Sequence, residues 1–234
     1  GSEMLPVVTL WQPWAELMRL GYKGIETRSW APTASVLRTG QAFAIHAAVK
    51  RSEEQARHWT EAKRLIARYD GRRLVEGFED LTYGAIVAVV VFQGAQPMTD
   101  HRGEFHRWVE ELHPMERAFG DYSPGRFGWH TGGLVPLDEP VPCRGMQKLW
   151  SAPVDVERRV VGCLVGKFRN SDLQQHAVPD PRHEPGGTDR ALDRAPDQQH
   201  LVRGHRRERR RDRHRQHQCG LRAQQPGDRR AVLP

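Results

Sequence analysis

The sequence lacks the features of disulfide-rich, membrane-spanning and zinc-binding proteins. Its 234 residues include three cysteines, with no CxxC pair, and the 12 histidines form no HExxH motif. No apolar run approaches the roughly 18 residues that suggest a transmembrane helix. No basic start is followed by an apolar stretch and a cleavage site. We therefore expect no membrane segment, no signal peptide, no bound metal or other cofactor, and a reducing, cytoplasmic location.

Aromatic residues are absent after Phe168, and the basic residues are unevenly placed. Residues 169–234 contain 15 Arg, no Lys and nine Asp or Glu, whereas the rest of the chain has 21 basic and 20 acidic residues. The net charge of +7 therefore comes mostly from residues 169–234. It gives no indication that residues 1–168 bind nucleic acid.

The same composition predicts the domain organisation. Residues 1–3 precede Met4 and are typical of a remnant left by an expression vector. Residues 4–166 form one domain, and residues 167–234 form a disordered tail rich in Arg, Gln and Pro, because that segment cannot bury enough apolar area. Three interpretations of the tail stay open: a basic arm for nucleic acid, a solvated tail, or translation out of frame.

Hydrophobic periodicity in residues 4–166 predicts strands interspersed with helices. Strands are expected at 7–10, 23–30, 41–47, 83–92, 126–135, 140–143 and, with weak alternation, 154–165; helices are expected at 13–21, 52–69 and 105–112. The stretch YGAIVAVVVF at 83–92 is almost entirely apolar and β-branched, which is typical of a central strand. These elements indicate an α+β fold, a small, mixed, partly closed β-barrel with helices packed over it.

The most informative stretch is GYKGIETRSW at residues 21–30. In a strand, alternation places Glu26 and Arg28 on one face and Thr27 on the other. A carboxylate beside a guanidinium, with the ammonium of Lys23 nearby, is suited to a polar pocket. The alternative is a structural cluster of ion pairs at the rim of the barrel.

Aromatic and amide side chains surround this stretch in the sequence. Trp11, Trp14 and Trp30 could stack on a nucleobase, a contact that contributes roughly 1–3 kcal/mol per base, although most tryptophans of a small domain belong to the core. The amide of Gln12 could read a base edge. His46 ends an apolar strand, as either a satisfied core histidine or a general acid or base that acts with Glu26.

The segment CRGMQKLW at residues 143–150 is a third polar motif. Arg144 and Gln147 are expected to face the ligand-binding cleft, and Gly145 is expected to allow close approach of the backbone. Trp150 is a further candidate for stacking on a base.

The order and spacing of these motifs resemble the ASCH domain (activating signal cointegrator homology) of the PUA-like superfamily. The similarity runs through LWQPWAELMRLGYKGIETRSW, GQAFAIHAA and PVPCRGMQKLW. It implies a small β-barrel with a cleft for RNA, DNA or a modified nucleotide. Some members are metal-assisted ribonucleases, and small bacterial members hydrolyse N4-acylated cytidine with a lysine, a threonine and a glutamate. Lys23 matches that lysine, but Glu26 stands in place of the threonine.

From these observations we expect a domain that binds a nucleotide, a modified nucleotide, RNA or another single-stranded nucleic acid, and that is a monomer. The base would lie between a tryptophan and the cluster of Lys23, Glu26 and Arg28. A nearly neutral domain favours a small ligand or a short strand. The alternative is a hydrolase with catalytic Lys23, Glu26 and His46, in which Glu26 is the general base. A nuclease of this kind would also use Mg²⁺ or Mn²⁺.

Overall fold

The computed structural model describes the backbone of residues 4–175 and the side chains as far as Phe168. In this part of the chain one mixed sheet has the strand order β2-β5-β4-β3-β1-β6. The strands are β1 (Pro6–Leu10), β2 (Ile25–Arg28), β3 (Ala42–Ala47), β4 (Ala85–Pro97), β5 (Phe127–Pro142) and β6 (Leu149–Ser151). Only β1 and β3 pair in parallel; the other described pairs are antiparallel.

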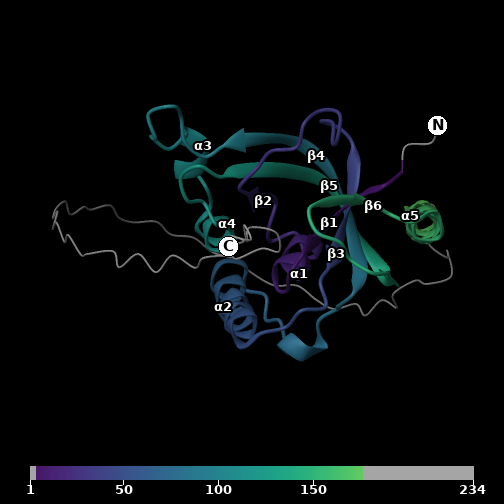
Figure 1. The fold of residues 1–234 in the computed structure, drawn as a ribbon. Coiled ribbons are helices and arrows are strands. Elements are labelled where there is room, and N and C mark those ends of the chain that lie inside the picture. The colour runs from purple at the N-terminus through teal and green to yellow at the C-terminus, as the bar shows by residue number, and fades with distance from the viewer. Residues whose placement is uncertain (1–3, 176–234) are drawn as a thin grey trace, which may run out of the picture.

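The sheet curls into a half-barrel (Figure 1). Strand β2 is first in the sheet order and β1 is fifth, and the two do not pair. Nevertheless, Nη2 of Arg28 on β2 donates a hydrogen bond of 3.2 Å to the carbonyl oxygen of Thr9 on β1. A side chain therefore crosses between strands that are far apart in the sheet order. This confirms the predicted mixed, partly closed barrel.

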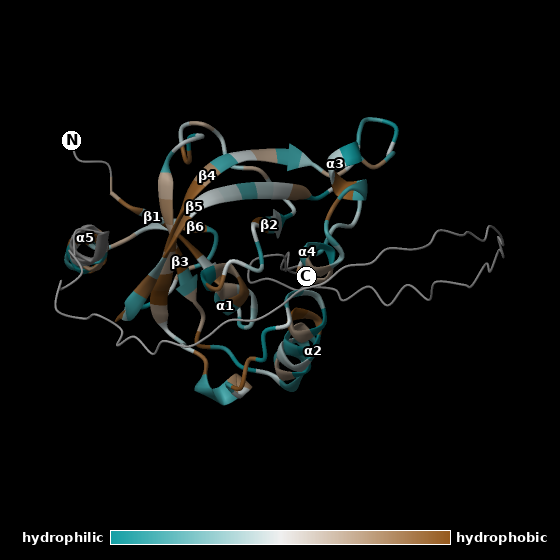
Figure 2. Cartoon of the chain, turned by 180° about the vertical axis from the view of Figure 1, so that it is seen from behind, coloured by the Kyte–Doolittle hydropathy of each residue, from teal (hydrophilic) through white to brown (hydrophobic). Residues whose placement is uncertain are grey.

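Strand β4 is central, as its apolar sequence predicts. It pairs with β3 on one side and β5 on the other, and residues 85–90 are all buried. Hydrophobic residues concentrate where the strands cross, and hydrophilic residues lie toward the loops and the outer helices (Figure 2). The main core includes Phe43, Ile45 and Trp129. The sheet is thus held by burial of β-branched and aromatic side chains.

The helices are α1 (Trp14–Arg19), α2 (Glu53–Asp70), α3 (Arg107–Glu110), α4 (Pro114–Ala118) and α5 (Val154–Gln175), with the 3-10 turn η1 (Phe78–Asp80). The predicted start of α2 is confirmed: Ser52 is its N-cap and accepts from the backbone N–H of Gln55. The helix ends at Gly71, whose φ is 72°. Trp59 and Ile66 bury one face of α2, as their helical spacing predicts.

Four predicted elements were wrong in type or extent. Residues 154–165 form helix α5 instead of a strand. Val156 and Val160 are buried four residues apart against the sheet, and this spacing matches a helix. Residues 126–135 and 140–143 belong to one bulged strand, β5. The helix expected at 105–112 is reduced to the four residues of α3.

The predicted start of the tail also needs correction. Helix α5 continues through residues 167–175, which the composition assigned to a disordered tail. The remainder of that prediction, at 176–234, and the vector remnant at 1–3 lie outside the described residues. Within the described helices, none is both long enough and apolar enough to cross a membrane.

Candidate functional site

The three charged residues of the motif form one buried cluster. Nε of Arg28 lies 2.9 Å from Oε1 of Glu26, and Nζ of Lys23 lies 3.8 Å from Oε2. Each of the three side chains is at most 5% exposed. The alternation predicted for this strand is confirmed, because Thr27 points the other way and its hydroxyl accepts from the backbone N–H of Asp121.

The carboxylate of Glu26 is held by charge and lacks well-aligned hydrogen bonds. Neither of its oxygens accepts a hydrogen bond from any described residue, although the two cations lie beside it. The donors around it have other acceptors: Lys23 donates to the carbonyl oxygen of Ile25, and Arg28 donates to that of Thr9. The site therefore contains two buried acceptor atoms whose hydrogen-bonding capacity is unused.

Thr9 connects this cluster to the motif at 143–150. Its carbonyl oxygen accepts from Arg28, and its hydroxyl accepts from Nε1 of Trp150 at 3.1 Å. Residues from β1, β2 and β6 thus meet where β1 and β2 approach without pairing. We call this region the β1–β2 seam and define it by Thr9, Glu26, Arg28 and Trp150. This role of Thr9 could not be predicted from the sequence, because a threonine in an apolar strand carries no local signal for it.

His46 lies next to the seam and holds the segment at 143–145. Its Nε2 lies 3.0 Å from the carbonyl oxygen of Cys143, and a carbonyl can only accept, so Nε2 carries the proton. The ring packs edge-on against Trp150, with centroids 5.9 Å apart. Burial lowers the pKa of His46, partly opposed by the bond to Cys143. The imidazole is therefore neutral near pH 7.

Gly145 approaches His46 as closely as its lack of a side chain allows. A Cβ at this position would lie 2.4 Å from Cε1 and 2.6 Å from Nδ1 of His46. The predicted close approach of the backbone at Gly145 is therefore confirmed. Because both ring nitrogens of His46 are turned toward residues 143–145, the geometry assigns this histidine to positioning that segment.

The tryptophans take different positions. Trp11 and Trp30 are half-buried, and each follows a seam residue by two positions in the chain. Trp30 packs edge-on against Trp129 with centroids 4.7 Å apart, and Nζ of Lys50 lies 4.5 Å from the centroid of Trp11. Trp14 is buried against His58 instead. Among the predicted stacking residues, Trp11 and Trp30 are thus the two that remain half-buried close to seam residues in the sequence.

Three other predicted ligand contacts do not reach the cluster. Gln12 is fully buried; its amide donates to the carbonyl oxygen of Thr82 and accepts from the backbone N–H of Glu16. It fixes the start of α1, and a contact to a base would have to replace these bonds. Arg144 and Gln147 are exposed, on the segment whose Gly145 lies against His46.

A second carboxylate, which belongs to no sequence motif, supports the start of β2. Glu116 on α4 accepts from the backbone N–H of Gly24 at 2.8 Å and from the hydroxyl of Tyr122 at 3.1 Å. Burial and the neighbouring carboxylate of Glu116 raise the pKa of that hydroxyl, so Tyr122 stays protonated and donates. Glu116 therefore helps to orient the strand that carries Glu26 and Arg28.

The charges around Glu26 disfavour a divalent cation there. Lys23 and Arg28 already neighbour the carboxylate, and like charges repel at such distances. Across the described residues, no group of three or more His, Cys, Asp or Glu side chains is arranged to hold a metal.

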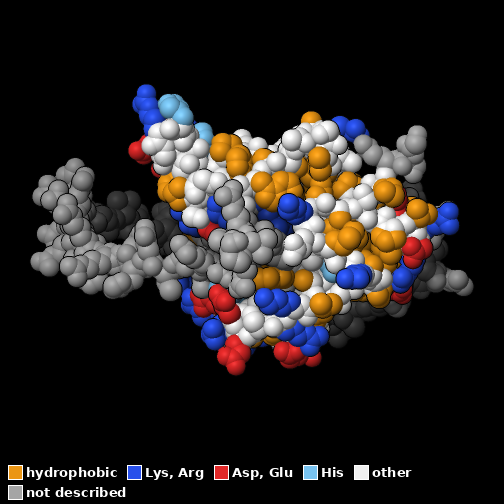
Figure 3. Space-filling view, viewed as in Figure 1, with side chains coloured by type: hydrophobic (Ala, Val, Ile, Leu, Met, Phe, Trp, Pro, Cys, Tyr) orange, Lys and Arg blue, Asp and Glu red, His pale blue; other side chains and the backbone are white. Residues whose placement is uncertain are grey.

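On the face of the molecule in Figure 3, basic side chains lie among apolar ones, and most acidic side chains lie near the periphery.

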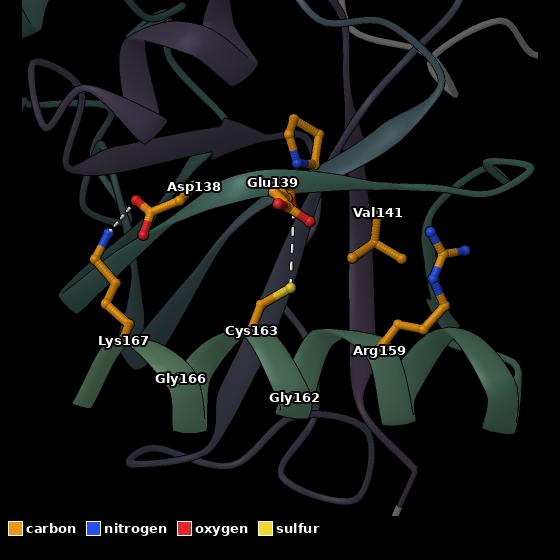
Figure 4. A pocket seen from close by; sticks show the side chains of 9 residues that line it. Asp138, Glu139, Val141, Arg159, Gly162, Cys163, Gly166 and Lys167 are labelled. Atoms are coloured by element: carbon orange, nitrogen blue, oxygen red, sulfur yellow. Dashed lines mark hydrogen bonds and ion pairs between the residues drawn. The ribbon is translucent and has the colours of Figure 1, made fainter. Parts of the chain in front are cut away.

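A separate groove of about 470 Å³ lies between α5 and β5. Nζ of Lys167 bonds to Asp138 at 2.9 Å at one end, and Sγ of Cys163 lies 3.9 Å from the carbonyl oxygen of Glu139 (Figure 4). Arg159 lies at the other end (Figure 4). None of its lining residues belongs to the charged cluster, and we assign it to helix–strand packing.

Comparison with known proteins finds similarity to solved structures alone. No protein-family model and no curated protein matches the chain. The similar structures include a point variant of the ASCH protein of Zymomonas mobilis (14% identity, 68% of this chain and 98% of that chain covered, TM-score 0.41). They also include ASCH from the same organism (13% identity, 68% and 94% covered, TM-score 0.39). At this identity the likeness concerns the fold alone.

Proposed function

We propose that this domain binds the base of a nucleotide or of a short single-stranded RNA at the β1–β2 seam. The observation that carries the proposal is the buried carboxylate of Glu26, whose two oxygens accept no hydrogen bond from the described residues. Bases offer N–H donors on their edges. The resemblance of the sequence to ASCH domains points to the same class of ligand.

The energetics of the cluster support a role in binding. Removing three charged groups from water costs several kcal/mol per ion, and ion pairing recovers this only with good geometry and further hydrogen bonds. Here the carboxylate has nearby cations but no aligned donor. Such an arrangement is poorly explained by stability alone and is typical of a functional site. Half-buried Trp11 and Trp30 would offer aromatic faces beside the base.

Hydrolysis is the alternative, with Glu26 as general base and Lys23 or Arg28 stabilising the developing negative charge. The geometry around His46 gives that residue a positioning role, so Glu26 carries this alternative by itself. A ribonuclease or a modified-nucleoside amidohydrolase would release products from the bound ligand.

A single substitution tests binding and turnover together. Glu26→Gln preserves the shape of the side chain but removes its charge and basicity. For a binding domain, affinity for nucleoside monophosphates or a short RNA should weaken by about 1–3 kcal/mol. For a hydrolase, binding should stay nearly intact while turnover falls about 10²- to 10⁴-fold.

Both quantities are measured on the same proteins, by titration calorimetry and by chromatography of products, with and without Mn²⁺. Glu111→Gln is the matched control, because Glu111 is an exposed partner of Arg107 and should change neither quantity. Wild-type protein that binds no nucleotide and no RNA would refute the proposed function.

A further inference from the structure

Glu26 offers a specific pattern to a ligand in the seam. Its two oxygens are adjacent, buried and without an aligned donor among the described residues. An ionised carboxylate can only accept hydrogen bonds. A ligand that fits must therefore present N–H or O–H groups, and two neighbouring donors would satisfy both oxygens at once.

The neighbours of Glu26 add one cationic group on each side. Nε of Arg28 lies beside Oε1, and Nζ of Lys23 lies nearer Oε2. An acceptor on the ligand, adjacent to its donors, would lie close to one of these cations. A phosphate is excluded from contact with Glu26 itself because the two anions repel. Given the proposed function, the group bound here is the base, with any phosphate directed away from the carboxylate.

From this pattern we infer that the seam selects guanine among the common bases, an inference that rests on the proposed function. Guanine carries the ring N1–H and the 2-amino group side by side, with the acceptor O6 next to them. The two donors match the two oxygens of Glu26, and O6 would lie near a cation. Two parallel hydrogen bonds to a carboxylate add geometric specificity as well as affinity.

The other bases match this pattern less well. Adenine and cytosine each present one amino group next to a ring nitrogen that accepts, so the second carboxylate oxygen would face a lone pair. Uracil has a single N–H between two carbonyl acceptors. A buried polar group left unpaired by the wrong ligand is a strong source of discrimination.

The experiment compares GMP with IMP, AMP, CMP and UMP by titration calorimetry on the full chain. IMP is the matched ligand, because it differs from GMP only in lacking the 2-amino group. We expect GMP to bind about 10- to 100-fold more tightly than IMP, the effect of one hydrogen bond to a charged group. The other three nucleotides should bind more weakly than GMP by at least the same factor.

A variant tests whether Glu26 is the source of the preference. Glu26→Gln replaces one acceptor with a donor, so the ratio of GMP to IMP affinity should fall toward one, whereas Glu111→Gln should keep the wild-type ratio. Thermal unfolding of each variant establishes that it folds, and Glu26→Asp provides a second test that retains the charge.

The outcomes separate the two proposals. Nucleotide binding with equal affinity for GMP and IMP, or a preference that survives Glu26→Gln, would overturn the selection of guanine and leave the binding function standing. No binding of any nucleotide or RNA would overturn both.

Discussion

Two arginine–glutamate pairs in this protein have similar lengths and opposite surroundings. On the surface, Nε of Arg107 lies 2.6 Å from Oε1 of Glu111, and the two side chains are 86% and 59% exposed. In the cluster, Nε of Arg28 lies 2.9 Å from Oε1 of Glu26, and the two side chains are 5% and 1% exposed. The surface pair follows from i,i+4 spacing and contributes little stability. The buried pair requires removal of both charges from water. The contrast indicates that the N···O distance of an ion pair does not by itself show how the pair affects stability.

The largest effect that would test this contrast is expected from Arg28→Ala. The change leaves Glu26 buried with Lys23 at 3.8 Å as its remaining nearby cation and removes the bond across the seam to Thr9. Breaking a buried pair by removing one partner costs about 3–5 kcal/mol. Urea denaturation of the variant and the wild type measures the loss.

The matched control is Arg107→Ala, which removes an exposed guanidinium whose Nε donates a hydrogen bond to Glu111. Its free energy of unfolding should change by no more than about 0.5 kcal/mol. Similar losses in the two variants would mean that water reaches the buried cluster freely, and the contrast between the pairs would disappear.

A smaller loss of stability is expected at Gly145, where the backbone lies against the His46 ring. Gly145→Ala would place a Cβ within 2.6 Å of the His46 ring, and overpacking of this kind costs about 1–3 kcal/mol. A Cβ added at Gly162 in α5 would meet no other atom within 4 Å. Gly162→Ala should therefore stabilise the helix by up to about 1 kcal/mol. Thermal unfolding measures the change in melting temperature of each variant, and the two changes should have opposite signs. A neutral Gly145→Ala would show that residues 143–145 relax away from the ring easily.

The sequence predicted those features that depend on local periodicity. Alternation in β2 was enough to place Glu26 and Arg28 together and Thr27 apart, because a strand has a period of two. The apolar, β-branched run in β4 identified the central strand. The valines of α5 were misleading: their β propensity outweighed the four-residue spacing of Val156 and Val160.

Contacts between distant segments could not be predicted in the same way. Thr9 joins Arg28 and Trp150 across separations of 19 and 141 residues, and Glu116 supports Gly24 across 92 residues. Neither residue belongs to a motif, so their roles depend on how the sheet curls. The amide of Gln12, which suited a base edge in the sequence, is engaged by the backbone for the same reason.

The smallest effect concerns the dependence of stability on pH. Burial lowers the pKa of His46 in the folded protein below its usual value of 6.5. As pH falls below 6.5, the unfolded chain binds a proton that the folded protein resists, so the free energy of unfolding decreases. The decrease continues until the pH reaches the folded pKa and then levels off. Stability from this residue is thus fully present above pH 6.5 and is lost on acidification.

His46→Gln isolates this contribution. The glutamine can keep an N–H donor for the carbonyl oxygen of Cys143 but does not titrate. Burial also lowers the pKa values of His58 and His130, and both remain in the variant, so the difference between the two proteins reports His46. Between about pH 7.5 and about pH 5.5, on either side of the usual histidine pKa, the wild type should lose more stability than the variant. Equal losses would mean that the folded protein accommodates a charged His46, and residues 143–145 would then have to move away from the ring when it is protonated.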